Sequence, residues 1–438
     1  MIRRISVPPF EGLEPLLPQR AGSDRATRET VAGILEDVVL RGDDAVREYT
    51  RRFDGVDLAP PEWELNPAQW QGALERIAPG LRAALGRAVD RVREYHEHQR
   101  EAGFRLEGDD GSVVGMKVTP VDRVGLYIPG GKASYPSSVV MNAVPALVAG
   151  VREIVAVVPP QGVTDIVLAA CALSGVTRIF RVGGAQAVAA LAFGTATIPR
   201  VDKIVGPGSR WVAEAKRQVV GQVGIDMIAG PTEILIIADG GASPARIATD
   251  LIAQAEHDED ATGWCVTTDA GIAAAIPAAL EAALTEAPRA AVARAALERN
   301  GLVIVVPAMR DAIEVANRRA PEHLEILAEG AERIASGIRH AGAIFLGDHT
   351  PEPVGDYLAG PSHVLPTGGT ARYASPLGVY DFVKRTSIIR YTPERLAAEA
   401  DAIVVLAEAE GLYGHAEAVR VRRVESGAGG QRGGGTAD

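Results

Sequence analysis

The side chains best suited to proton transfer in this sequence are Glu322 and His323, which are adjacent in the segment R-A-P-E-H-L-E. Pro321 precedes them and favours a turn or the first position of a helix. A carboxylate beside an imidazole is a plausible general-base pair, because either group can accept a proton from a bound substrate. We expect the pair to lie at a junction between a strand and a following helix.

Nitrogen and oxygen donors suited to a metal ion occur in three further segments. Q-A-E-H places Gln254 and His257 three residues apart, on one face of a predicted helix at its end. The acidic D-E-D that follows favours an ordinary solvated helix end instead, so both interpretations stay open. Asp356 and His363 share the segment P-V-G-D-Y-L-A-G-P-S-H, and His415 lies in E-A-E-G-L-Y-G-H-A. A zinc site needs about four such donors, and the sequence alone does not show that these converge.

Glycine-rich turns follow several predicted strands and suggest a nucleotide site. In open α/β sheets ligands bind beyond the carboxyl ends of the strands, where glycine lets the backbone approach a ligand and a helix N-terminus can hold a phosphate. No G-x-G-x-x-G is present, so the pattern departs from the usual dinucleotide fingerprint. The turns are P-G-G at Pro129, V-G-G-A-Q at Val182, V-G-P-G at Val205 and A-G-P-T at Ala229.

The elements that must position these residues form two series of short apolar strands alternating with helices. Continuous apolar strands separated by helices indicate parallel sheets covered on both faces. The predicted fold class is therefore α/β, with two doubly wound parallel-sheet domains. The expected strands are 124–129, 153–160, 178–184 and 203–208, then 234–238, 262–268, 301–306 and 343–346, and two long helical patterns, 25–52 and 67–103, precede them.

Composition narrows the class of protein further. The net charge is −11 and no Lys/Arg-rich stripe is present, so we expect no nucleic-acid partner. Cys171 and Cys265 lie in apolar surroundings, as expected of packed thiols in a reducing compartment. The N-terminus lacks the apolar core of a secretory signal, and the most apolar stretch, 139–151, is too short to span a membrane. We therefore expect a soluble, cytoplasmic protein.

Taken together, the motifs resemble those of the histidinol dehydrogenases. The matching stretches run in family order from about residue 25 to 425. They are V-G-L-Y-I-P-G-G-K-A-S-Y-P-S-S-V-V-M-N, V-G-G-A-Q-A-V-A-A-L, I-D-M-I-A-G-P-T-E-I, L-I-A-Q-A-E-H-D, A-P-E-H-L-E, V-G-D-Y-L-A-G-P-S-H-V-L-P-T-G-G and A-E-G-L-Y-G-H.

This resemblance implies a zinc-dependent, NAD-linked oxidation of L-histidinol to L-histidine through histidinaldehyde, which ends histidine biosynthesis. It implies a homodimer with exchanged segments and a composite active site, in which the last zinc ligand comes from the partner. The implied zinc ligands are Gln254, His257, Asp356 and His415, and the implied catalytic residues are Glu322 and His323. Substrate contact is implied for Thr232, His363 and Glu410, and also for the four zinc ligands and His323. NAD contact is implied for Tyr127, Gln186 and Ser209.

Two positions depart from the family pattern. The family usually has Asn where this chain has Ser209, and often Ser where it has Thr232. Thr232 keeps the hydroxyl group, whereas Ser209 lacks the amide and offers only a hydroxyl group for that cofactor contact.

The resemblance also implies a division of the chain into domains that follow the aldehyde-dehydrogenase-like, incomplete Rossmann plan. The expected parts are an N-terminal arm at 1–24, a larger α/β domain of 25–126 with 234–377, an inserted α/β domain at 127–233 on the NAD side, a C-terminal segment at 378–425 that completes the partner's site, and a disordered tail at 426–438.

Three alternative functions remain at this point. A dehydrogenase of the same scaffold could act on another small alcohol, such as a sulfonated diol, with the metal ligands and the Glu322–His323 pair kept. A thiol-dependent aldehyde dehydrogenase would use Cys265 as its nucleophile, although a reactive thiol needs an accessible, electropositive site. A binding protein without catalytic activity is disfavoured, because all the implied catalytic and ligand positions carry chemically competent side chains.

Overall fold

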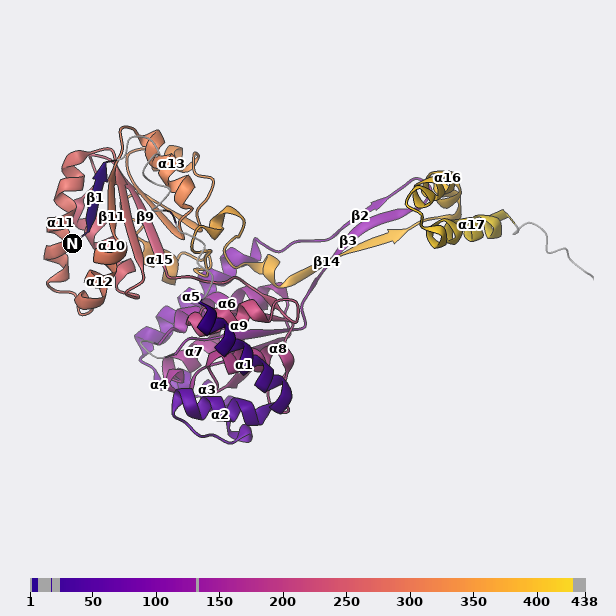
Figure 1. Cartoon of the computed structure of the whole chain (residues 1–438), viewed down its shortest axis with the longest axis horizontal. Coiled ribbons are helices and arrows are strands. Elements are labelled where there is room, and N and C mark those ends of the chain that lie inside the picture. Colours follow the sequence, from indigo (N-terminus) through magenta and orange to yellow (C-terminus); the bar gives the residue numbers. More distant parts are fainter. Residues whose placement is uncertain (1, 7–16, 18–23, 131–133, 428–438) are drawn as a thin grey trace, which may run out of the picture. The chain divides into compact units, whose positions relative to one another are not determined.

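The computed structural model describes residues 2–6, 17, 24–130 and 134–427, with side chains up to 423. Contacts divide the chain into two compact units (Figure 1). The first contains the residues up to Arg100 together with Val121–Phe382, and the second contains Glu101–Pro120 together with the residues from Val383 onward. The tail from residue 428 lies outside the described residues.

The first unit contains a five-stranded parallel sheet with the order β6-β5-β4-β7-β8. Because the chain leaves β4 in one direction and returns beside it as β7, the strand order reverses between these two strands. That reversal is the place where doubly wound sheets bind ligands. The strands are β4 (Arg123–Tyr127), β5 (Glu153–Val157), β6 (Arg178–Phe180), β7 (Lys203–Val205) and β8 (Gly224–Ile225).

Helices cover both faces of this sheet, as the continuous apolar strands predict. On one face α5, α6 and α7 share a core with Val124, Leu126 and Ile154. On the other face α1, α2, α8 and α9 share a core with Val155 and Val157. The helices are α1 (Arg25–Arg41), α2 (Asp43–Asp54), α3 (Pro67–Gln71), α4 (Ala73–Arg76), α5 (Pro79–Glu97), α6 (Pro136–Ala149), α7 (Asp165–Leu173), α8 (Gly184–Phe193) and α9 (Arg210–Gln218).

Helices α1–α5, which belong to the predicted part 25–126, make their main contacts with α6–α9. An amphipathic helix can cover any apolar face of suitable width, so its sequence does not name the sheet that it packs on.

The first unit also contains a six-stranded parallel sheet with the order β1-β11-β10-β9-β12-β13. Helices α10–α12 cover one face, and α13 and α14 cover the other. The strands are β1 (Arg3–Ser6), β9 (Glu233–Ala238), β10 (Thr262–Thr267), β11 (Leu302–Val305), β12 (His323–Leu327) and β13 (Ala343–Leu346). The helices are α10 (Pro244–Ala255), α11 (Ala270–Leu284), α12 (Ala290–Asn300), α13 (Met309–Arg319), α14 (Ala331–Ala335) and α15 (Glu352–Tyr357). The α/β class with two parallel sheets is thus confirmed.

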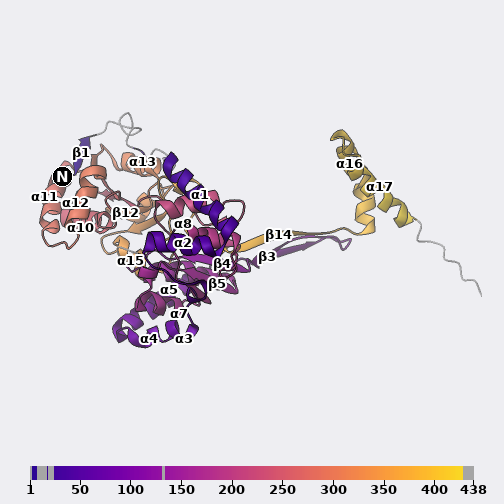
Figure 2. The ribbon, with the colours of Figure 1, turned by 60° about the horizontal axis from the view of Figure 1, so that its bottom comes forward.

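The second unit is an antiparallel three-stranded sheet followed by a helical pair (Figure 2). Its strands, in the order β14-β3-β2, are β2 (Phe104–Glu107), β3 (Val113–Pro120) and β14 (Val383–Arg390), and its helices are α16 (Pro393–Ala409) and α17 (Tyr413–Gly427). Two segments more than 250 residues apart in sequence therefore form one sheet, since Val383 pairs with Pro120.

Short 3₁₀ helices occupy Pro60–Glu62, Pro160–Gly162, Thr370–Arg372 and Val379–Asp381. Within the described ranges, no helix combines the length and the apolar character that crossing a membrane requires.

Candidate active site

The Glu322–His323 pair lies where helix α13 gives way to strand β12. The expected junction was a strand followed by a helix, and this prediction was wrong: α13 ends at Arg319 and β12 begins at His323. Ala320 between them has φ of 49°, the left-handed conformation that ends a helix. The pair therefore lies at the amino end of its strand, whereas we expected ligands beyond the carboxyl ends.

Glu322 is buried, with 7% of its surface exposed, and two donors hold one oxygen of its carboxyl group. The Thr232 hydroxyl donates to Oε2 at 2.7 Å, and the backbone N–H of Glu233 donates to the same atom at 2.9 Å. Burial raises the pKa of Glu322 to about 8, although these hydrogen bonds oppose the shift. The carboxyl group is thus fixed in orientation and can exchange a proton near neutral pH.

His323 is buried and presents one ring nitrogen to the site. Nδ1 lies 3.1 Å from the carbonyl oxygen of Glu233, which accepts only from a protonated nitrogen. The proton therefore sits on Nδ1, and Nε2 keeps its lone pair. Burial lowers the pKa of His323 to about 4, so the ring is neutral at pH 7. A neutral imidazole with a free Nε2 is a base.

Gln254 extends the network that begins at Glu322. Its Nε2 donates to the hydroxyl oxygen of Thr232. Its Oε1 is buried and has no hydrogen-bond partner within the described residues. An unpaired buried amide oxygen is costly unless a ligand or an ion satisfies it, so Gln254 Oε1 is available as a donor to a metal.

His257 likewise has a ring nitrogen that could bind a metal ion. It follows the last turn of α10, and its Nδ1 lies 3.0 Å from the carbonyl oxygen of Ala253. This contact puts the proton on Nδ1 and leaves Nε2 free, which is the arrangement of a metal-binding histidine. Asp356, His363 and His257 all lie near enough to His323 to influence its pKa, so the structure brings these groups into one neighbourhood.

Asp356, in α15, belongs to a compact cluster of possible metal ligands that also includes His323 of β12. Donor atoms of His323, Glu352 and Asp356 lie within 4.8 Å of one another. Only Asp356 was expected to bind metal, and Glu352 was missed. Glu352 lies four residues before Asp356, hence on the same helical face, and this spacing was the signal that could have identified it. Burial and the neighbouring Asp356 raise the pKa of Glu352 to about 9.

The donors present fit a zinc ion. Gln254 Oε1 has no hydrogen-bond partner among the described residues, Nε2 of His257 keeps its lone pair, and the carboxyl group of Asp356 adds an oxygen donor. Zinc accepts nitrogen and carboxylate oxygen donors, usually four in number. His363 Nε2 is also buried without a hydrogen-bond partner in the described part of the chain, so a further polar contact can be made there.

Of the residues expected to contact NAD, Tyr127 ends β4 and Ser209 follows β7, the two strands between which the order reverses, whereas Gln186 lies in α8, which follows β6. Tyr127 ends β4, and its hydroxyl oxygen accepts a hydrogen bond of 3.0 Å from the N–H of Gly184, the first residue of α8. Gln186 is fully buried, and neither polar atom of its side chain has a partner among the described residues. Ser209 caps α9 without a side-chain hydrogen bond to the helix. The unpaired amide of Gln186 is a polar group that a bound nucleotide could satisfy.

The turn after β7 approaches the backbone at the end of β4 closely. Gly206 follows β7 with φ of 110°, and a Cβ there would lie 2.2 Å from the carbonyl oxygen of Tyr127. Only glycine fits this position, and the turn V-G-P-G therefore has a steric cause in the structure.

The remaining two predicted site residues lie in the second unit. Glu410 is the C-cap residue of α16, and His415 lies in the first turn of α17. Both side chains are exposed within that unit.

The structure argues against a thiol nucleophile. Cys265 lies in the middle of β10, fully buried, and burial raises the pKa of its thiol to about 12. Cys171 is equally buried. The expectation of packed thiols is confirmed.

An α/β fold with two parallel sheets, a neutral imidazole beside a fixed carboxyl group and unpaired polar donors are features of the class of NAD-dependent oxidoreductases. A family model described as "Histidinol dehydrogenase" matches residues 17–423. The chain belongs to the histidinol dehydrogenase family, whose members act in histidine biosynthesis.

Similar proteins agree with this assignment. A histidinol dehydrogenase of Pseudomonas syringae pv. syringae is 52% identical over 413 residues, which cover 94% of this chain and 92% of the relative. One from Syntrophotalea carbinolica is also 52% identical, over 91% of this chain and 93% of the relative. The crystal structure of histidinol dehydrogenase from Elizabethkingia anophelis superposes with a TM-score of 0.92 at 33% identity, covering 98% of this chain and 99% of that one.

Proposed function

We propose that this chain oxidises L-histidinol to L-histidine in two steps through histidinaldehyde, with one zinc ion per subunit and two NAD molecules per turnover. The observation that carries the proposal is the pairing of a neutral His323, whose Nε2 keeps its lone pair and lies 3.7 Å from Oε1 of Glu352, with a Glu322 carboxyl group that two donors hold in place. Two successive oxidations need one base for a hydroxyl proton and one group that activates water.

Gln254, His257 and Asp356 would hold the zinc ion, with His415 of the partner subunit as the fourth ligand. When bound, zinc would orient the substrate through its amine and imidazole nitrogens. NAD, held near Tyr127, Gln186 and Ser209, would accept the hydride in each oxidation.

His323 is the base of the first oxidation. Its Nε2 takes the hydroxyl proton of histidinol as the carbon–hydrogen bond breaks, and the product is the aldehyde. Glu322 then takes a proton from water as the water oxygen bonds to the aldehyde carbon, and His323 returns its proton to the former carbonyl oxygen, which gives the hydrate. His323 then takes one hydroxyl proton of the hydrate as a second hydride passes to NAD, which gives the carboxylic acid. Release of the remaining acid proton to solvent yields the carboxylate of histidine.

Thr232, His363 and Glu410 are the proposed contacts to the polar groups of the substrate. Thr232 has a second role, because its hydroxyl joins Gln254 to Glu322. A change of these contacts, with the catalytic pair unchanged, would redirect the same scaffold to another small alcohol, such as a sulfonated diol.

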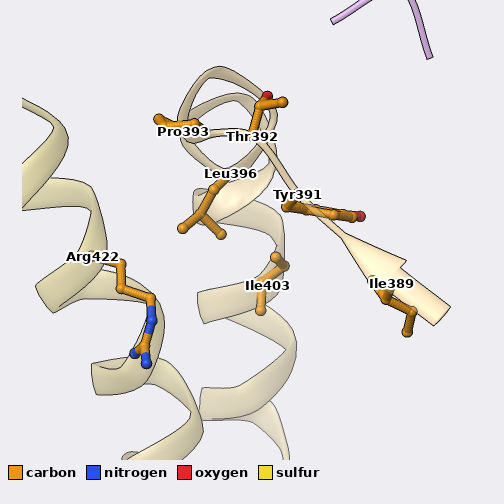
Figure 3. A pocket seen from close by; sticks show the side chains of 7 residues that line it. All are labelled: Ile389, Tyr391, Thr392, Pro393, Leu396, Ile403 and Arg422. Atoms are coloured by element: carbon orange, nitrogen blue, oxygen red, sulfur yellow. The ribbon is translucent and has the colours of Figure 1, made fainter. Parts of the chain in front are cut away.

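A homodimer with composite sites is supported by the apolar surface of the second unit. Ile389, Val405 and Leu406 are 71%, 64% and 67% exposed there, far more than apolar side chains in a protein core. Figure 3 shows an open, mostly apolar groove of this unit. Its lining residues are Ile389, Tyr391, Thr392, Pro393, Leu396, Ile403 and Arg422.

We propose that a second copy of the chain covers this surface and that Glu410 and His415 then complete the partner's site. Isologous pairing of like surfaces is the commonest route to a dimer. The site and the homodimer are expected to operate in the cytoplasm.

The function is tested by measuring the NADH formed per L-histidinol consumed in the untreated enzyme, after treatment with a chelator, and after zinc is added back. Two NADH per histidine, lost on chelation and recovered with zinc, support the substrate, the metal and the four-electron course. Absence of histidinol turnover by the folded, zinc-loaded protein would contradict the proposal and direct attention to other small alcohols.

A further inference from the structure

Glu233, the first residue of β9, holds both members of the catalytic pair through its main chain. Its N–H donates to Oε2 of Glu322 at 2.9 Å, and its carbonyl oxygen accepts from Nδ1 of His323 at 3.1 Å. A shift of this one peptide segment would therefore change the orientation of the carboxyl group and of the imidazole together.

The side chain of Glu233 is fixed by a buried ion pair. One of its carboxylate oxygens accepts from the guanidinium of Arg319, and the other accepts from the N–H of Gly368 at 3.0 Å. Glu233 and Arg319 are only 3% and 5% exposed. The carboxylate thus ties β9 to the segment that follows His363, in addition to the helix α13.

Arg319 is itself placed by its surroundings. It is the last residue of α13, three positions before Glu322, and its guanidinium lies over the ring of Trp264 at 5.1 Å from the centroid. The left-handed turn at Ala320 then leads directly to Glu322. The ion pair therefore joins the end of α13, just before Glu322, to the start of β9.

A plain gain in stability is a weak reason for such a pair. Removing two charges from water is expensive, and replacing a buried ion pair by apolar side chains is often neutral or stabilising. Positioning is the better-supported role, because both ends of this pair lead within three residues to a side chain of the proposed chemistry.

We propose that Glu233 and Arg319 are positioning residues, which set the orientation of Glu322 and His323 without touching substrate. The inference rests on the proposed function, since it assigns the pair to the oxidation of histidinol. Displacement of catalytic groups by about 1 Å can lower a rate about 100-fold, so the effect is expected in kcat.

The test is the double variant Glu233→Gln with Arg319→Met, which removes both charges and leaves neither unpaired. We expect kcat to fall about 10- to 100-fold. We expect KM for NAD and the zinc content to stay within about twofold of the wild type, because neither residue is placed at the cofactor or the metal. The matched control is Ile276→Ala, a core truncation in α11, which should lower the thermal midpoint while leaving kcat unchanged.

A second variant tests the inference if the double variant does not fold. Arg319→Lys keeps the charge but loses the planar fork, so an intermediate kcat is expected. A crystal structure of the stable variant gives a readout that needs no turnover, and the imidazole of His323 should be rotated away from the Glu233 carbonyl oxygen.

Wild-type kcat in the double variant, or an equal loss of kcat in Ile276→Ala at the same loss of thermal midpoint, would overturn the inference. An unmoved His323 in the crystal structure would do the same. Failure of the wild type to oxidise histidinol is a different result, because it contradicts the proposed function and leaves the structural readout to decide the positioning role.

Discussion

His323 and Glu233 face each other across the paired strands β12 and β9, with 3.1 Å between Nδ1 of the ring and the carbonyl oxygen. The contact selects one tautomer of the imidazole. It leaves Nε2 as the ring nitrogen able to accept a proton, as the proposed role of His323 requires.

Replacement of His323 by Asn should remove this base while keeping a polar side chain of smaller size. We expect kcat for histidinol to fall about 10²- to 10⁴-fold, the usual contribution of general-base catalysis. Steady-state kinetics at saturating NAD measure the effect. An unchanged kcat would show that another group takes the proton.

Replacement of Glu322 by Gln should spare the first oxidation more than the second. Gln keeps an oxygen that accepts from Thr232 but cannot take a proton from water. NADH formed per histidinol consumed should therefore fall from two toward one, and aldehyde should accumulate. Equal loss of both steps would contradict the separate role of this residue.

Removal of a metal ligand should be distinguishable from removal of its neighbour. Asp356→Ala should lose zinc on dialysis, because a charged oxygen donor is deleted. Glu352→Gln should retain it, since Glu352 is not in the proposed ligand set although its side chain lies in the same cluster. Zinc content measured by mass spectrometry compares the two variants, and equal loss from both would place Glu352 among the ligands.

The thiols should be inert in the native protein. A thiol with a pKa of about 12 carries almost no thiolate at pH 8, and Cys265 is fully buried. Treatment with iodoacetamide should leave activity unchanged. Cys265→Ala should keep its activity and lose about 1–2 kcal/mol of stability through the small cavity that it creates. Inactivation that substrate prevents would instead revive a thiol mechanism.

Mixing two inactive variants should restore activity if the sites are composite. A His415→Ala chain and a His323→Asn chain each lack one part, but a hybrid dimer of the two contains one intact site. With random exchange of subunits, about a quarter of wild-type activity is expected, since half of the dimers are hybrids with one working site of two. No recovery after verified exchange would place His415 and His323 of the same chain in one site.

Local sequence patterns predicted much of the fold because they depend on short-range physics. The apolar runs that became β4, β5, β9 and β10 are continuous, as buried parallel strands require, and the helical segments between them have the right period. Strand β12 was missed because His323 and Glu325 interrupt its apolar pattern, although both are buried. Those polar residues are tolerated there only because the tertiary structure supplies their partners.

The sequence by itself determined the α/β class, the polar residues able to do chemistry and, through its motifs, the family. It could not determine which sheet α1–α5 would cover, that residues 104–120 would pair with 383–390, or that Glu352 would join Asp356 and His323. Only the tertiary structure decided the tautomer of His323 and the fixed orientation of Glu322. The physical reason is that pairing, burial and hydrogen-bond partners are set between segments far apart in the chain, whereas composition and periodicity report only what each segment prefers on its own.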